Sequence, residues 1–172
     1  AFPGISADGS RIAYVVRQCD SIGKCTADVV IQDIGGAGSA TVVRGLLGAW
    51  DVKWTADGRY LVYGASEAAD RWGAFSVPTL GGDPRFLGCC NVTIVGNSDT
   101  ALVARPASVG DSIAWLRWVT VSDGIVRDSM AVGADGSGLG LVAKPFPGGD
   151  RLLVLQRRTR SGTASITTRS GV

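Results

Sequence analysis

Apolar and polar residues alternate along most of the chain, and the alternating runs come in pairs that flank short turns. The clearest pairs surround Asp8-Gly9 and Asp57-Gly58. Alternation with a period of two predicts half-buried strands, and an Asp-Gly turn between two such runs predicts a tight hairpin. Less regular versions of the same hairpin run from Val92 to Val103 and from Leu141 to Leu155.

Each of these hairpins is followed by more strand-like sequence. The second hairpins turn at Gly35, Gly81 and Asp123, and the fourth copy adds a run over Ala164–Arg169. The repeating unit therefore has four strands in roughly 40–50 residues, which is the size of a β-propeller blade. We expect a single module over residues 1–172. Its approximate blades are 1–45, 46–88, 89–133 and 134–172.

Amino-acid usage also favours strands over helices. Of the 15 acidic residues only Glu67 is a glutamate, and of the 17 basic residues only three are lysines. Glu and Lys are typical of exposed helix faces, whereas Asp is typical of turns. The best helical candidate is the short segment Ala65–Arg71, which fits either a helix or a turn. We therefore predict an all-β, β-propeller-like fold with about four four-stranded antiparallel blades, in a small or incomplete ring.

Length, charge and composition restrict the function. The chain has 172 residues and a formal net charge of +2, which gives no general case for binding nucleic acid. It contains no histidine, which excludes Ser-His-Asp and Cys-His catalysis and most zinc sites. No apolar run approaches the ~18–20 residues of a membrane-spanning helix. We expect no metal and no cofactor. The sequence begins at Ala1, so we expect either a removed leader or a piece of a longer chain.

The four cysteines allow three interpretations. Cys19 and Cys25 bracket a polar loop between two strand-like runs, and Cys89 and Cys90 are adjacent. We favour two disulfides in an oxidising compartment, although a bond between adjacent cysteines would be strained. Reduced, buried cysteines are the second interpretation. A metal site is the third, and it would need the four thiolates to converge without the usual ligand spacing.

The first two units resemble a known repeat. Ser6-Ala-Asp-Gly-Ser-Arg-Ile-Ala-Tyr14 and Thr55-Ala-Asp-Gly-Arg-Tyr-Leu-Val-Tyr63 resemble the "S-P-D-G-x-x-I-A-F" core of TolB-like, PD40-type propeller repeats. Phe75-Ser-Val-Pro-Thr-Leu-Gly-Gly-Asp-Pro-Arg-Phe-Leu87 is similar to the hairpin that follows this core in the family. The resemblance covers about half of the chain. Ala7 and Ala56 stand where the family usually has proline.

The resemblance implies a binding or scaffolding module, because the repeat itself carries no catalytic residues. Such repeats occur in periplasmic TolB-like proteins, in propellers attached to prolyl-oligopeptidase-like peptidases and in extracytoplasmic sensor regions of bacterial kinases. We therefore expect a non-enzymatic, extracytoplasmic protein that is peripheral to the membrane. It would bind the protein subunits of a larger membrane-associated assembly. The alternatives are the propeller portion of a peptidase whose catalytic domain lies elsewhere, and a ligand-sensing kinase ectodomain.

Two groups of residues are candidates for partner binding. Arg71 and Trp72 follow a polar connection, and both residue types are enriched at interface hot spots. A tryptophan buried at the start of a strand is the alternative. Arg157, Arg158 and Arg160 belong to a C-terminal blade that is rich in arginine and has no acid after residue 150. That blade could face an acidic protein surface or anionic headgroups, or it could be a solvated edge strand.

Two further expectations concern the last two units. Trp115 and Trp118 should lie on opposite faces of one strand, with both packed between neighbouring blades. The fourth unit supplies three runs before the sequence ends, so we expect an unpaired edge along Ala164–Arg169. A partner subunit, further residues of the same chain or a second copy would cover this edge, with strand addition as the favoured contact.

Overall fold

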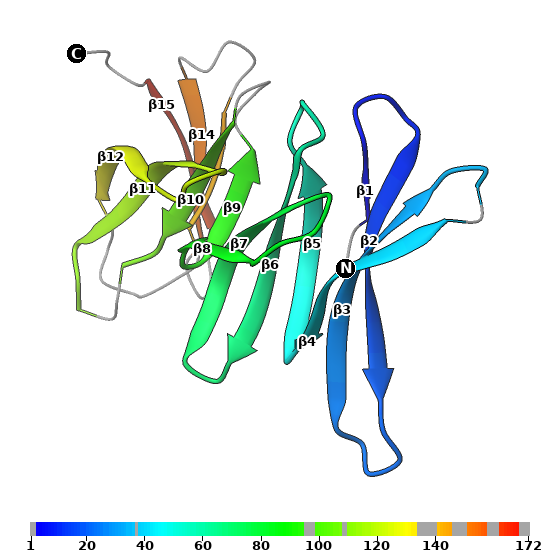
Figure 1. The fold of residues 1–172 in the computed structure, drawn as a ribbon. Coiled ribbons are helices and arrows are strands. Elements are labelled where there is room, and N and C mark those ends of the chain that lie inside the picture. Colours follow the sequence, from blue (N-terminus) through cyan, green and yellow to red (C-terminus); the bar gives the residue numbers. More distant parts are fainter. Residues whose placement is uncertain are drawn as a thin grey trace.

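The computed structural model describes residues 3–36, 38–94, 99–107, 110–133, 141–145, 151–157 and 162–168. These residues form antiparallel sheets and turns with no helix (Figure 1). The first sheet consists of β1 (Gly4–Ile5), β2 (Arg11–Cys19), β3 (Cys25–Asp33) and β4 (Ser39–Leu46). The second consists of β5 (Gly48–Trp54), β6 (Tyr60–Ala68), β7 (Arg71–Pro78) and β8 (Arg85–Gly88).

The third sheet consists of β9 (Asn91–Ile94), β10 (Thr100–Arg105), β11 (Ile113–Thr120) and β12 (Val126–Gly133). The fourth contains β13 (Leu141–Pro145), β14 (Arg151–Arg157) and β15 (Gly162–Thr168). Within every sheet the strands pair in chain order. The predicted all-β fold of four-stranded antiparallel units is confirmed, with three strands of the fourth unit among the described residues. No helix that could cross a membrane occurs in the described part of the chain.

The helical interpretation of Ala65–Arg71 is wrong. Strand β6 continues to Ala68, and β7 begins at Arg71 after a short turn. Ala65 pairs with Gly73 and Ser66 with Trp72 across this hairpin. The partners of Ala65 and Ser66 lie outside the segment, so their pairing overrides any weak helical preference within the segment itself.

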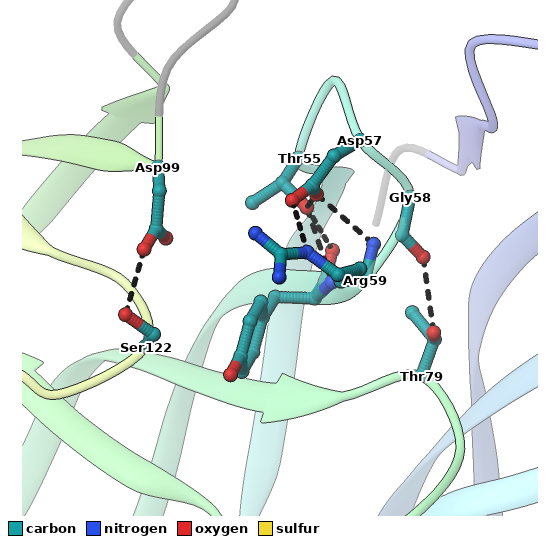
Figure 2. Close-up of polar contacts among 8 residues, drawn as sticks. Thr55, Asp57, Gly58, Arg59, Thr79, Asp99 and Ser122 are labelled. Atoms are coloured by element: carbon teal, nitrogen blue, oxygen red, sulfur yellow. Dashed lines mark hydrogen bonds and ion pairs between the residues drawn. The ribbon is translucent and has the colours of Figure 1, made fainter.

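The Asp-Gly turns form as predicted, because side chains on either side of the turn hydrogen-bond to the aspartate. Thr55 Oγ1 donates to Asp57 Oδ1 at 2.7 Å, the Arg59 amide donates to the same oxygen at 3.0 Å, and Gly58 has a φ of 69° (Figure 2). These bonds, that from Thr55 first, lower the pKa of Asp57 to about 2. Of the corresponding turn in the third unit only Asp99 is described, and its Oδ2 accepts a hydrogen bond from Ser122 Oγ at 2.6 Å (Figure 2). The turn of the fourth unit lies outside the described residues.

The sheets pack face to face in chain order, and each interface has its own hydrophobic cluster. Ala13, Val29 and Val43 of the first sheet meet Leu61, Tyr63, Phe75 and Val77 of the second. Val62, Ala74 and Leu87 of the second sheet meet Ala101, Val103, Val119 and Val121 of the third. Leu102, Leu116 and Trp118 of the third sheet meet Ala143, Leu152 and Val154 of the fourth. The result is a row of four sheets that runs from β1–β4 to β14 and β15 (Figure 1).

The two ends of the sheets carry different connections. The Asp-Gly turns and the turns that lead into β4, β8 and β12 lie at one end. The other end carries the β2–β3, β6–β7 and β10–β11 connections and the passages from one sheet to the next. We call this second end the crossover end. The β2–β3 hairpin extends from it at the bottom of Figure 1.

The two tryptophans of β11 face opposite sides of the third sheet. Trp118 is buried against the fourth sheet, as expected. The expectation that Trp115 is also packed between blades is wrong, because its side chain is 38% exposed. Trp115 shares a face with Val119, which packs against the second sheet. However, Trp115 lies nearer the crossover end, beyond the short strand β8.

Candidate functional site

A cavity of about 360 Å³ lies where the first strands of three sheets come together. We call it the inner-strand pocket. Strand β5 contributes Trp50, Asp51 and Lys53, β9 contributes residues 91–93, and β13 contributes Ala143 and Lys144. Because these strands come from different repeats, residues far apart in the sequence share one cavity.

An irregularity in β5 shapes the pocket. The pairing of β5 with β6 shifts register between Trp50 and Lys53, and Asp51 within this bulge has a φ of 50°. The Trp50 indole lies directly over Gly64 of β6, so closely that a Cβ at Gly64 would collide with the ring. Because Gly64 has no side chain, the indole fits against β6 at this position and forms one wall of the pocket.

The pocket brings together two of the three lysines of the chain. Lys53 Nζ donates a hydrogen bond to the Val92 carbonyl at 3.2 Å. Burial lowers the pKa of Lys53, while the negative charge of Asp51 opposes this shift and the positive charge of Lys144 adds to it. Two ammonium groups and one carboxylate leave a net positive pocket, and an added anionic group would relieve the repulsion between the lysines.

The predicted partner-binding pair begins strand β7. Trp72 is 47% exposed, in line with the exposed rather than the buried alternative. Arg71 is exposed but interacts within the chain. Its Nε lies 3.2 Å from Glu67 Oε2, and its guanidinium lies 5.9 and 5.6 Å from the ring centroids of Phe75 and Phe86.

The other candidate residues fall at the C-terminal end of the chain. Arg157 is the last residue of β14, and only its backbone is described. Arg158 and Arg160 lie outside the described residues.

Both cysteine pairs are joined as disulfides. Cys19 and Cys25 face each other across the β2–β3 hairpin, with their Cα atoms 4.0 Å apart. Cys89 and Cys90 are joined to each other in the connection between β8 and β9, and the peptide bond between them is cis. Within the described ranges, no three His, Cys, Asp or Glu side chains lie close enough together to hold a metal ion.

Sequence reasoning did not identify the inner-strand pocket, although a signal was present. Lys53 and Lys144 are rare residue types that occupy the first strand of the second and fourth units. The first strands of successive propeller blades converge, so lysines at these positions can share a site. Asp51 and Trp50 had no comparable signal, because their placement depends on the bulge in β5.

No known family's sequence model matches the chain, and no curated protein sequence matches it either. Solved structures do resemble it. TolB from Acinetobacter baumannii is 14% identical with a TM-score of 0.65, and the match covers 96% of this chain and 40% of TolB. The β-propeller domain of the Trilobed protease from Pyrococcus furiosus is 12% identical with a TM-score of 0.66, over 96% of this chain and 52% of that domain.

A prolyl endopeptidase structure is 12% identical with a TM-score of 0.67, and the match covers 98% of this chain and 26% of the endopeptidase. The chain thus spans about half the length, or less, of these similar structures. Matches at such low sequence identity carry information on fold alone. Together with the four packed sheets, these structural matches show that the chain has a TolB-like β-propeller fold.

Proposed function

We propose that this chain is a non-enzymatic β-propeller module that binds another protein through the inner-strand pocket. The observation that carries the proposal is the convergence of Lys53 and Lys144, from different sheets, beside the Trp50 indole. Ligand cavities commonly have volumes of about 300–1,000 Å³ and combine apolar walls with a few placed charges. The pocket has this size and character.

The chemistry of the pocket favours an acidic segment of a partner. A carboxylate that enters between the two ammonium groups would gain charge-assisted hydrogen bonds. It would also offset the repulsion from Lys144, which adds to the lowering of the Lys53 pKa by burial. Trp50 offers an aromatic surface for the neighbouring part of the same segment, and tryptophan is enriched among residues that dominate binding energy.

The disulfides and the structural neighbours support an extracytoplasmic location, and we propose that the protein lies at the membrane periphery there. Disulfides such as Cys19–Cys25 persist in oxidising compartments and are rare in the cytosol. TolB is among the similar structures. The partner would then be a subunit of a membrane-bound assembly.

The alternative is the propeller portion of a peptidase, because propellers of prolyl endopeptidases and acylaminoacyl peptidases are similar to this chain. A hydrolase domain encoded in the same reading frame would favour it. A membrane helix and a kinase domain there would favour a sensor ectodomain. Peptide or ester turnover that follows the purified chain through successive columns would contradict the non-enzymatic part of the proposal.

Affinity capture from the native membrane fraction tests the binding role. The bait proteins are the unmodified chain, a Lys53→Ala/Lys144→Ala variant, and Lys24→Ala as the matched control. Lys24 is the third lysine and is exposed in the β2–β3 hairpin, away from the pocket. We expect one partner with the unmodified chain and with Lys24→Ala, and its loss with the double variant. Equal capture by all three baits, or capture by none, would contradict the proposal.

A further inference from the structure

Lys53 is half-buried in the wall of the inner-strand pocket, whereas Lys24 and Lys144 are exposed. Its neighbour Trp54 packs against the first sheet, so the Lys53 side chain, on the opposite face of β5, points toward the third. There its Nζ donates to the Val92 carbonyl of β9 at 3.2 Å. The amine therefore has a defined position at the cavity.

The charged side chains that line the pocket around Lys53 are Asp51 and Lys144. The other lining residues have no ionisable side chain, because Cys90 is joined to Cys89 in a disulfide. Burial makes the largest contribution to the lowered pKa of Lys53, Lys144 lowers this pKa further, and Asp51 opposes the change. Near neutral pH, Lys53 therefore has a larger fraction of neutral amine than an exposed lysine has.

These surroundings make the Lys53 amine a candidate nucleophile. Lysines become reactive toward carbonyl groups when burial or a neighbouring cation lowers their pKa, and both causes act on Lys53. The hydrogen bond to Val92 uses an N–H group, so the lone pair of the neutral amine remains available. The cavity of about 360 Å³ has room for a small molecule, and the Trp50 indole provides an apolar wall.

We propose that Lys53 is a reactive amine that condenses with an aldehyde carrying an anionic group. The Nζ lone pair attacks the carbonyl carbon, and the two amine protons leave with the carbonyl oxygen as water. The product is an imine, in which a C=N bond replaces the C=O bond. Lys144 attracts the anionic group, and the apolar part of the aldehyde lies against Trp50. This reaction occurs in the pocket described above but does not rest on the binding of a partner protein.

Reductive trapping with two matched aldehydes tests this site. 4-Formylbenzoate carries an anionic group, and benzaldehyde has the same ring without it. Sodium cyanoborohydride delivers a hydride to the imine carbon and gives a stable secondary amine, which peptide mapping by mass spectrometry locates. We expect 4-formylbenzoate to label Lys53 about tenfold faster than Lys24, because a positively charged pocket concentrates anions. Benzaldehyde should lose most of this preference.

The comparison of lysines is made within the unmodified chain, so it needs no variant. Labelling of Lys53 no faster than that of Lys24, or label that falls chiefly on Lys144, would overturn the proposal. The same preference for Lys53 with both aldehydes would also overturn it, because the anionic group would then have no role. Rapid labelling of Lys53 in a chain that captures no partner would contradict only the protein-binding function.

Charge variants test the role of the neighbouring residues. Asp51→Asn removes the charge that opposes the lowered pKa of Lys53, so labelling should become severalfold faster, and asparagine tolerates the φ of 50° at this position. Lys144→Gln should slow labelling of Lys53 by 4-formylbenzoate about tenfold, and the control Lys24→Gln should leave it unchanged. Far-UV circular dichroism checks that each variant is folded. A rate of Lys53 labelling that none of these substitutions changes would overturn the proposal.

Discussion

Trp54 joins the first two sheets, and its replacement tests how they pack. The indole is buried, and its Nε1–H donates to the Gly4 carbonyl of β1 at 2.9 Å. The Arg11 guanidinium of β2 lies 4.7 Å from the centroid of the ring. One side chain of the second sheet thus contacts two strands of the first.

The three contributions can be separated by substitution. Trp54→Ala removes the ring and leaves a cavity, which costs about 3–5 kcal/mol for a buried aromatic side chain. Trp54→Phe retains much of the apolar area and loses the hydrogen bond, at a cost of about 1 kcal/mol. Arg11→Ala removes the cation–π contact, which contributes about 0.5–1 kcal/mol at a partly exposed site. We therefore expect destabilisation in the order Trp54→Ala, Trp54→Phe, Arg11→Ala.

Urea unfolding followed by far-UV circular dichroism measures these differences without relying on tryptophan fluorescence. Trp115→Ala is the matched control, because that ring is 38% exposed, compared with 8% for Trp54. It should cost less than half as much as Trp54→Ala. Equal losses for the two alanine variants would refute the inference that Trp54 is packed between the sheets.

Three further predictions follow from the turns, the pocket and the disulfides. In the folded protein the pKa of Asp57 is lowered from 3.8 to about 2, so its contribution to stability is present above pH 4 and is lost as the pH falls toward 2. Asp57→Asn should therefore flatten this part of the curve of unfolding free energy against pH. An unchanged curve would contradict a stabilising role of the Asp57 carboxylate. Gly64→Ala should displace the Trp50 indole and destabilise the chain by about 1–3 kcal/mol, measured by urea unfolding, whereas unaltered stability would show that the ring does not need this space. Intact-mass measurement after alkylation without reductant should find Cys19 and Cys25 unmodified, and four alkylated thiols would rule out both disulfides.

The strand order could be predicted from the sequence because its determinants are local. The Asp8 and Asp57 turns are specified by the aspartate, the following glycine with positive φ and the Ser or Thr two residues before. Alternating residues on either side then define the hairpins. The segment Ala65–Arg71 is harder to interpret, because the order of apolar and polar residues within it does not indicate its pairing with β7.

The candidate sites depend on contacts between sheets, which the sequence does not reveal directly. Lys53 and Lys144 meet only because the first strands of separate repeats converge. The exposure of Trp115 likewise depends on the shortness of the facing strand β8.

Site-specific photo-crosslinking tests most directly the claim that the inner-strand pocket binds a protein. A photo-reactive phenylalanine replaces Thr93, which lines the pocket, or Leu80, which is 97% exposed in the β7–β8 turn at the opposite end of the sheet. After irradiation with the native membrane fraction, we expect one discrete protein adduct from position 93. This adduct should disappear when Lys53→Ala is added, and position 80 should not form it. No adduct at position 93, or the same adduct from position 80, would show that the pocket does not bind the partner protein.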